Sequence, residues 1–310
     1  MPTYMRAQSL KSVVEPLLAD SFPVEIVVVV DGCQDGSIEI LKRLATTDRR
    51  LKPVWIENSG EMGARQAGVE MATGTIVLML DDDVYAKPGL AADHARRHAE
   101  AENLLVLGYM PTLPSEAVRF TQFATYLYAV EYENACRRYE EHPDSILRCL
   151  WAGNLSMRRD DALRVGLNTP GGYTSRYHQD REFGIRCLKA GMAGAFDRYL
   201  LAQHVHSRTL ASFRRDSRQE GLGRRILHEI HGDLLGPMPT DEFERGLGPL
   251  LASLIRFCDR DFAYRAVSAA LDATVQISGR LRLFEVEVNA AKLLRRIEQR
   301  RGSRLTVDPG

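Results

Sequence analysis

Residues Thr75 to Val84 read TIVLMLDDDV, an apolar run that passes directly into three consecutive aspartates. The part up to Leu80 has the composition of a strand buried on both faces. Neighbouring carboxylates repel one another unless a cation or hydrogen-bond donors neutralise them. This segment therefore predicts a buried strand whose end carries a charged site.

Helix-like and strand-like segments alternate through the first third of the chain. The strand-like runs are VEIVVVV (24–30), PVWIE (53–57), TIVLML (75–80) and LLVLGYM (104–110), and the helix-like segments span 7–20, 37–46 and 63–72. This alternation predicts an α/β fold with a mostly parallel central sheet and helices on both faces. Such sheets bind ligands at the carboxyl ends of their strands, where Asp31 and the aspartate run are expected.

The remainder of the chain is dominated by helical patterns. An aromatic-rich stretch from Ser115 to His142 reads as a long helix, and the sequence after about Asp241 lacks strand signals. A Gly-Pro-Met-Pro turn at 236–239 predicts the boundary between a domain of residues 1–235 and a helical extension of residues 236–310.

The overall composition excludes several functional classes. The 310 residues contain 41 basic and 41 acidic side chains, so no net charge favours a nucleic-acid partner. The five cysteines are scattered and show no C-x-x-C pair, which argues against disulfides and structural zinc and fits a reducing cytoplasm. No run reaches the roughly 18 apolar residues of a membrane-spanning helix. The sequence thus predicts a cytoplasmic protein, or one peripheral at the inner face of a membrane.

The aspartate run itself suggests a metal site. In an extended chain Asp81 and Asp83 project to the same side and Asp82 to the other, so Asp81 and Asp83 would share a divalent cation and a bound diphosphate. Oxygen ligands suit Mg²⁺ or Mn²⁺. The alternative is an acidic turn in which Asp83 caps a helix that starts near Pro88.

Four blocks occur in a diagnostic order: VVVVDGCQDGS, ENSGEMGARQAGVEMATGTIVLMLDDD, WAGNLSMRRDDAL and YHQDREFGIRCLKAGM. Together they make the chain, over about residues 2 to 225, similar to the family 2 glycosyltransferases, which have the GT-A fold. The second block matches the family pattern Asn-x-Gly-x-x-x-Ala-Arg-Asn-x-Gly except that Gln66 replaces an asparagine. The resemblance implies an inverting, metal-dependent transfer from a nucleotide sugar, with a UDP-sugar favoured.

The resemblance also implies roles for individual residues on the donor side. The donor nucleotide would contact Pro2, Thr3, Tyr4, Asp31, Arg65, Asp81 and Asp82, and the metal would be held by Asp83 with Asp81, His204 or His206. The plainer alternatives are an Asp-Gly turn at Asp31, a solvated helix position for Arg65 and packed histidines at 204 and 206.

On the acceptor side, Asp180 matches the family's catalytic base, which takes a proton from the acceptor hydroxyl. Gln179 stands where the family carries a glutamate, and Glu182 is the second candidate base. Acids are also favoured at a helix N-terminus by the helix dipole, which is the structural alternative for both. The loop with Trp151, Gly153 and Asn154 would line the acceptor side, Trp151 either stacking on a sugar or packing in the core.

Two features depart from the family or extend beyond it. The chain starts inside the motif Pro-Thr-Tyr-Asn-Arg, with Met5 in place of asparagine, so the first strand is expected to be missing or truncated. Apolar residues from Leu281 to Ile297 recur at helical spacing, which predicts docking on the catalytic domain, on a second subunit or on a membrane surface. Several late arginines, Arg208 to Arg225, either clamp an anionic ligand or form a solvated face.

The leading hypothesis is therefore a single-addition glycosyltransferase that acts on a carbohydrate, lipid-linked or small-molecule acceptor. A sugar nucleotidyltransferase is the first rival, although its Gly-rich basic phosphate loop is not visible. A non-catalytic nucleotide-sugar-binding subunit is the second, because of Gln179 and the shortened start.

Overall fold

The valine run forms strand β2 (Ile26–Asp31) in the computed structural model, the middle strand of a parallel three-stranded sheet. Its neighbours are β1 (Pro2–Thr3), which is only two residues long, and β3 (Leu51–Ile56). The register sets Thr3 beside Val30. Because parallel strands end at the same edge, Thr3 and Asp31 reach the same end of the sheet.

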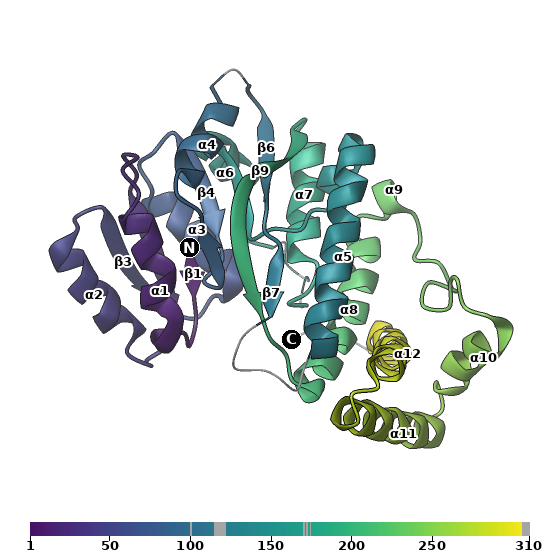
Figure 1. Ribbon diagram of the computed structural model, residues 1–310. Coiled ribbons are helices and arrows are strands. Elements are labelled where there is room, and N and C mark those ends of the chain that lie inside the picture. Colours follow the sequence, from purple (N-terminus) through teal and green to yellow (C-terminus); the bar gives the residue numbers. More distant parts are fainter. Residues whose placement is uncertain (100, 115–121, 170, 172, 174, 306–310) are drawn as a thin grey trace. The chain divides into compact units, whose positions relative to one another are not determined.

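The valines of β2 alternate between two helical layers. Val28 and Val30 pack with α1 (Ala7–Leu18) and α2 (Ser37–Thr47) in one buried cluster. On the other face, a Cβ added to Gly68 of α3 (Gly60–Met71) would lie 3.4 Å from a methyl carbon of Val29. Helices therefore cover both faces of this sheet, as the sequence predicts (Figure 1).

A second, mixed sheet continues the same unit. Its strands are β4 (Ile76–Leu80), β8 (Asn154–Arg158), β6 (Leu104–Tyr109), β9 (Ala193–His206) and β5 (Val84–Ala86) in spatial order, with β7 (Thr112–Pro114) paired to β9. The pair β6–β9 is parallel, whereas β8 runs antiparallel to both β4 and β6 and β5 runs antiparallel to β9. The parallel arrangement expected from the sequence thus describes the first sheet, whereas β8 and β5 make the second sheet mixed.

The structure describes residues 1–99, 101–114, 122–169, 171, 173 and 175–305. These residues fall into two compact units. Unit 1 comprises Met1–Leu113, Glu131–Thr169 and Asp180–Val205, and unit 2 comprises Pro114–Val130, Pro170–Gln179 and His206–Gly310. Further helices of unit 1 are α4 (Leu90–Arg97), the 3-10 helix η1 (Pro143–Arg148), α6 (Arg159–Val165) and α7 (Gln179–Lys189), whose first residue belongs to unit 2.

The long aromatic-rich helix is confirmed as α5 (Gln122–Glu141), which contributes to both units, while residues 115–121 of that prediction lie outside the described residues. The other helices of unit 2 are α8 (Leu210–Ile230), α9 (Gly232–Leu235), α10 (Pro249–Phe257), α11 (Asp261–Arg280) and α12 (Phe284–Ser303). Within the part of the chain that the structure describes, no helix combines the length and apolarity needed to cross a membrane.

Helix α12 packs closely against α8 within unit 2. The backbone of Gly302 approaches the carbonyl of Arg218 so closely that a Cβ would not fit. The apolar face predicted from Leu281 to Ile297 is largely buried here, Ala291 and Leu294 completely. The part of this face from Val288 to Ile297 packs against neighbouring helices of unit 2 and is therefore not available to a membrane, whereas Leu281 at its start is 63% exposed. The late arginines Arg214 and Arg218 pair with the buried Glu298 of α12, so they are neither a ligand clamp nor a solvated face.

Candidate active site

The three aspartates that follow β4 form a turn. The Val84 amide donates to the Asp81 carbonyl at 3.1 Å, which closes the turn before β5 begins. The expectation of an extended chain, with Asp81 and Asp83 on one side and Asp82 on the other, is therefore wrong. The turn instead directs Asp81 toward Arg65, and Asp82 and Asp83 toward Arg6 near the start of the chain.

Asp81 is held by Arg65 of α3. The Arg65 guanidinium donates from Nη2 to Asp81 Oδ1, and the same nitrogen lies 2.8 Å from Glu61 Oε1. Arg65 is only 5% exposed, and although burial opposes its charge, the Asp81 and Glu61 carboxylates raise its pKa. The alternative of a solvated Arg65 is wrong. A buried guanidinium shared by two acids is a fixed fork of donors of the kind that binds phosphates.

Glu61 was not predicted as a site residue from the sequence, although its i,i+4 spacing to Arg65 on one helix indicates an ion pair. The Arg65 charge lowers its pKa, but desolvation and the neighbouring carboxylates of Asp81, Asp180 and Asp83 outweigh this and raise the pKa of Glu61 to about 7. The same interactions show that Asp180 belongs to this electrostatic cluster.

Asp82 and Asp83 contact the start of the chain. The Thr3 hydroxyl donates to Asp82 Oδ2 at 2.7 Å, and Arg6 Nη2 donates to Asp83 Oδ2 at 2.9 Å. Burial, opposed by Arg6 and Thr3, raises the pKa of Asp82 to about 6. Tyr4, which lies between Thr3 and Arg6 in the sequence, is 55% exposed, while the backbone of Pro2 pairs with Val29. Residues 2–4 therefore adjoin the acidic turn.

His204 is the histidine that contacts the acidic turn. Its Nε2 lies 3.4 Å from Asp83 Oδ1, because Val84 pairs directly with His204 where β5 meets β9. The two predicted histidines do alternate on one strand and both are buried. His206, however, belongs to unit 2, where its ring stacks on Tyr128 with centroids 4.3 Å apart.

The donor set at Asp83 and His204 fits a divalent cation. A carboxylate oxygen and an imidazole nitrogen face each other, and both are ligands of Mn²⁺. The Arg6 guanidinium pairs with the other oxygen of Asp83, so a cation would compete with it for this carboxylate. Among the described residues no group of three or more His, Cys, Asp or Glu side chains gathers around one point. A metal here would take its remaining ligands from a bound diphosphate and water, as Mg²⁺ and Mn²⁺ commonly do.

Asp31 ends β2 and organises the loop between β3 and α3. It accepts the Ser59 amide at 2.7 Å and the Asn58 side-chain amide at 3.3 Å. Gly32 follows with φ +74°, and a Cβ there would lie 2.6 Å from the Asn58 nitrogen. The predicted Asp-Gly turn is present, and Asp31 is 5% exposed at the same sheet edge as Thr3.

Asp180 lies in the first turn of α7. Its Oδ2 accepts the Ala152 amide at 3.1 Å and its Oδ1 accepts the Arg181 amide at 2.8 Å. Burial raises the pKa of Asp180 despite these hydrogen bonds and the nearby Arg65 charge. A carboxylate that binds protons more readily than usual suits a general base.

Glu182, the second candidate base, is completely buried. Both of its oxygens accept from Arg186 Nε, at 2.9 and 3.0 Å, and Arg186 also donates to the Val165 carbonyl at 2.9 Å. This geometry assigns Glu182 to the anchoring of α7. Gln179 is the first residue of α7 and belongs to unit 2.

The loop before β8 packs on the acidic turn through Gly153. The Asp81 amide donates to the Gly153 carbonyl at 3.2 Å, and a Cβ on Gly153, whose φ is +128°, would lie 3.0 Å from Asp81 Oδ2. Trp151 packs edge-on against Tyr132, with ring centroids 5.5 Å apart. This contact agrees with the alternative in which Trp151 packs against other side chains, although its indole remains partly exposed.

Asn154 lies behind this loop in a buried polar cluster that the sequence did not reveal. Its Nδ2 donates to the Leu200 carbonyl at 2.9 Å, and its Oδ1 lies 3.0 Å from His94 Nε2. His94 and His98 both contact the Ser156 hydroxyl, at 2.7 and 2.8 Å. Burial lowers the pKa of His94 to about 4, so the cluster is neutral. Asn154 is 1% exposed and holds β8 and β9 in place.

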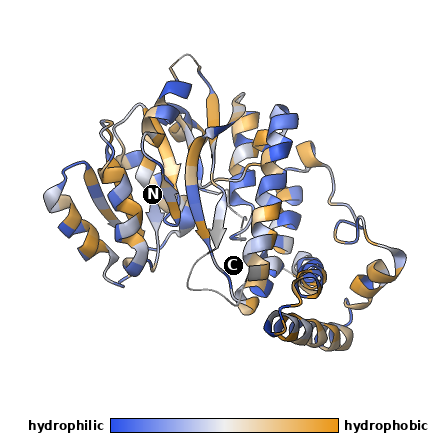
Figure 2. Cartoon of the chain, in the orientation of Figure 1, coloured by the Kyte–Doolittle hydropathy of each residue, from blue (hydrophilic) through white to orange (hydrophobic). Residues whose placement is uncertain are grey.

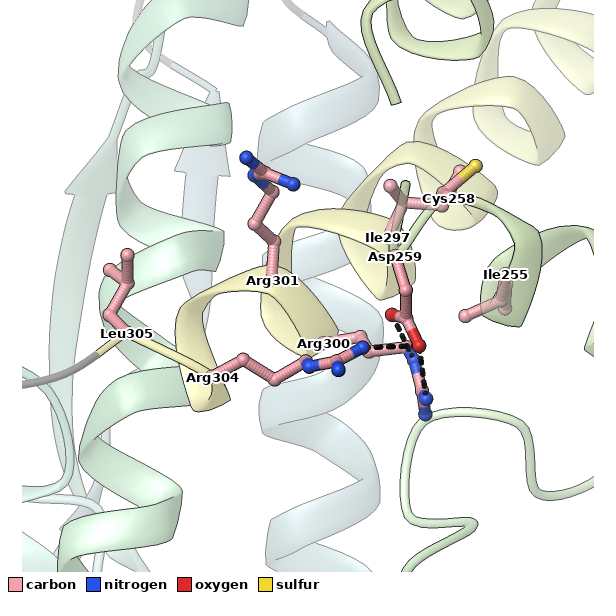
Figure 3. A pocket seen from close by; sticks show the side chains of 8 residues that line it. All are labelled: Ile255, Cys258, Asp259, Ile297, Arg300, Arg301, Arg304 and Leu305. Carbon is pink, nitrogen blue, oxygen red and sulfur yellow. Dashed lines mark hydrogen bonds and ion pairs between the residues drawn. The ribbon is translucent and has the colours of Figure 1, made fainter. Parts of the chain in front are cut away.

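A cavity of about 240 Å³ in unit 2 has a different character (Figure 3). It contains three arginines, but the Asp259 carboxylate lies between Arg300 and Arg304 and pairs with both. Arg301 pairs with Asp261. The residues that line this cavity were not predicted as site residues from the sequence, and its arginines serve to hold carboxylates of unit 2.

Comparisons with known proteins agree with the geometry. The sequence model of the family described as "Glycosyl transferase family 2" matches residues 1–161. A glucosyl-dolichyl phosphate glucuronosyltransferase of Haloferax volcanii is 27% identical over 164 residues, which is 52% of this chain and 51% of that protein. An uncharacterized glycosyltransferase of Nostoc, alr2836, is 36% identical over 87 residues, 27% of each chain. The chain thus spans about half or less of the length of these relatives.

The fold also matches a solved structure. Mannosyltransferase PcManGT from Pyrobaculum calidifontis, in complex with GDP-Man and Mn²⁺, superposes with a TM-score of 0.56 at 15% sequence identity, covering 96% of this chain and 84% of that one. The likeness concerns the fold, a mixed α/β structure of the GT-A type with a helical C-terminal region. With a family match over more than half of its residues, the chain belongs to glycosyl transferase family 2.

Proposed function

We propose that this glycosyltransferase moves a sugar from a nucleoside diphosphate donor onto an acceptor hydroxyl, with inversion at the anomeric carbon and with help from a divalent cation. The observation that carries the proposal is the convergence of Arg65, the acidic turn and His204 at one place in unit 1. The proposal assigns catalysis to residues 1–235 and treats residues 236–310 as a helical extension.

On the donor side, Asp31 and residues 2–4 would surround the nucleoside, because they adjoin one another at the end of β1 and β2. Arg65 would donate to the diphosphate, and Asp81 keeps its guanidinium in place. Asp83 and His204 would hold Mn²⁺ or Mg²⁺, which when bound would neutralise the diphosphate and make it a better leaving group. His206 is not part of this proposal, since its ring stacks on Tyr128 in unit 2.

On the acceptor side, Asp180 would accept the hydroxyl proton as the acceptor oxygen bonds to the anomeric carbon and the bond to the diphosphate breaks. The Ala152 amide fixes one of its oxygens, so the carboxylate is oriented before the acceptor arrives. Trp151 and Gly153 would border the acceptor, and Gln179 would stand near the entry to α7. We assign Asn154 a positioning role, because it is buried and bonded to His94 and Leu200.

The donor nucleotide is the first unknown to test. Calorimetric titrations with UDP, GDP and dTDP, each with and without Mn²⁺, would identify the base. We expect UDP to bind in the presence of the metal, and the GDP-Man in the PcManGT complex makes GDP the informative comparison. Absence of metal-dependent binding by all three would contradict the proposed donor site.

Turnover separates this proposal from its rivals. With the matching nucleotide sugar, the wild-type protein should release the nucleoside diphosphate. Loss of this release in Asp180→Asn would support transfer. Release of pyrophosphate would indicate a nucleotidyltransferase, and binding without Asp180-dependent turnover would indicate a subunit that only binds the donor. The anomeric configuration of the product, read by NMR, tests inversion directly.

A further inference from the structure

Helices α10 and α11 of unit 2 expose an unusual face. The exposed positions of α11 after Asp261 are Phe262, Arg265, Ala266, Ala269, Ala270, Ala273, Gln276, Ile277 and Arg280. None of them is acidic, and apolar residues recur at spacings of three and four, so they form one stripe along the helix. The outer face of a helix in a soluble protein usually carries charges of both signs. The opposite face of α11, with Val275 and Ser278, is buried.

Large apolar side chains extend this stripe at both ends. Phe262 is 66% exposed and packs edge-on against Phe257 of α10, with ring centroids 5.7 Å apart. Leu250 on α10 is 88% exposed, and Leu281 at the far end of α11 is 63% exposed. Figure 2 shows hydrophobic colouring along much of α10. Isolated exposed apolar residues are common, but a continuous set over two helices indicates a binding surface.

The arginines of this face differ from those elsewhere in unit 2. Arg214, Arg218, Arg300, Arg301 and Arg304 all pair with carboxylates. By contrast, among the residues that the structure describes, the following form no ion pair: Arg256, Arg260, Arg265, Arg280 and Arg282. Arg260 instead lies over the Phe257 ring, 5.2 Å from its centroid. The face is therefore both apolar and positively charged.

We propose that the exposed face of α10 and α11 binds an anionic lipid bilayer, with α11 lying in the plane of the membrane surface. Aromatic and aliphatic side chains would enter the interface while the arginines contact lipid phosphates, which is the pattern of interfacial amphipathic helices. A second copy of the chain fits less well, because a self-complementary contact would set this arginine-rich face, whose exposed positions on α11 after Asp261 carry no acid, against itself. The proposal concerns binding alone and does not depend on the identity of the donor or acceptor.

The test is flotation of the full chain with vesicles of phosphatidylcholine, with and without phosphatidylglycerol. Wild type should float with the anionic vesicles and remain unbound with the neutral ones. Arg265→Glu/Arg280→Glu should weaken binding by more than about tenfold, since each arginine near an anionic surface contributes roughly a factor of five. Phe262→Ser/Ile277→Ser should also weaken it, and because all four side chains are exposed, both variants should fold normally.

Matched controls make the same changes elsewhere. Lys42→Glu/Arg43→Glu reverses two exposed charges on α2, and Met71→Ser/Tyr199→Ser removes two exposed apolar groups from unit 1; both should float like wild type. Failure of wild type to float with anionic vesicles would overturn the proposal, as would equal binding by all variants. A third result would also overturn it: the wild type binds no vesicles, and light scattering shows a wild-type dimer that Phe262→Ser/Ile277→Ser converts to a monomer.

Discussion

His204 Nε2 lies 3.4 Å from Asp83 Oδ1, although 120 residues of sequence separate the two side chains. The contact exists because β5 begins directly after the acidic turn and pairs antiparallel with β9, in a register that sets Val84 beside His204. The pairing of the short β5 with the end of the long β9 thus assembles a carboxylate and an imidazole that fit one divalent cation.

This contact predicts that His204 supports metal-dependent nucleotide binding. Replacing His204 with alanine should weaken Mn²⁺-dependent binding of the nucleoside diphosphate by about tenfold or more, because the cation loses a nitrogen ligand. Calorimetric titration measures this. His206→Ala is the control from the same strand and should leave nucleotide binding close to wild type. Equal losses in the two variants would remove His204 from the metal site.

Asp180 should control turnover rather than binding. Asp180→Asn should keep the nucleotide affinity and lower kcat by about 10²- to 10⁴-fold, the usual contribution of a general base. Burial raises the pKa of Asp180, so this side chain gains a proton at a higher pH than an ordinary aspartate does. As the pH is lowered, the wild-type kcat should therefore begin to fall at that higher pH. A pH–rate profile of the wild type tests this, and an acid limb at the usual aspartate pKa would argue against Asp180 as the base.

Glu61 should make nucleotide affinity depend on pH near neutrality. Its pKa is raised to about 7, so it gains a proton as pH falls through that value. The protonated side chain no longer repels a diphosphate or competes for Arg65, which predicts tighter nucleotide binding just below pH 7 than just above it. Glu61→Gln should bind tightly at both pH values. Titrations over this range in both proteins measure the difference, and an unchanged pH dependence in the variant would exclude Glu61 as its source.

Local features of the chain were readable from the sequence, but the partners of its site residues were not. The valine run and the run before Asp81 predicted two strands correctly because an apolar segment bounded by turn residues has few other structures. Asp81 to Asp83 looked like one extended metal motif. Their separate partners, Arg65, Thr3 and Arg6, depend on a turn and on strand pairing that spacing does not encode.

The two acids of α7 show the same limit. Asp180 and Glu182 are two residues apart at the start of one helix, and either one fits a base by sequence alone. The direction that each side chain takes separates them, since Asp180 meets the Ala152 amide while Glu182 turns into the core toward Arg186. The spacing of Glu182 and Arg186 by four residues was the available sign of an ion pair.

That buried pair leads to a prediction about stability. Glu182→Ala would leave the Arg186 guanidinium without its carboxylate, and removing one partner of a buried ion pair typically costs about 3–5 kcal/mol in the free energy of unfolding. Arg186 also keeps its bonds to the carbonyls of Val165 and Gly166, which places the expected loss at the lower end, about 3 kcal/mol. Urea denaturation measures it. Glu15→Ala, which removes an exposed i,i+4 pair with Lys11, is the matched control and should change stability by less than about 1 kcal/mol. If Glu182→Ala instead retains wild-type stability and loses turnover, Glu182 rather than Asp180 takes the proton.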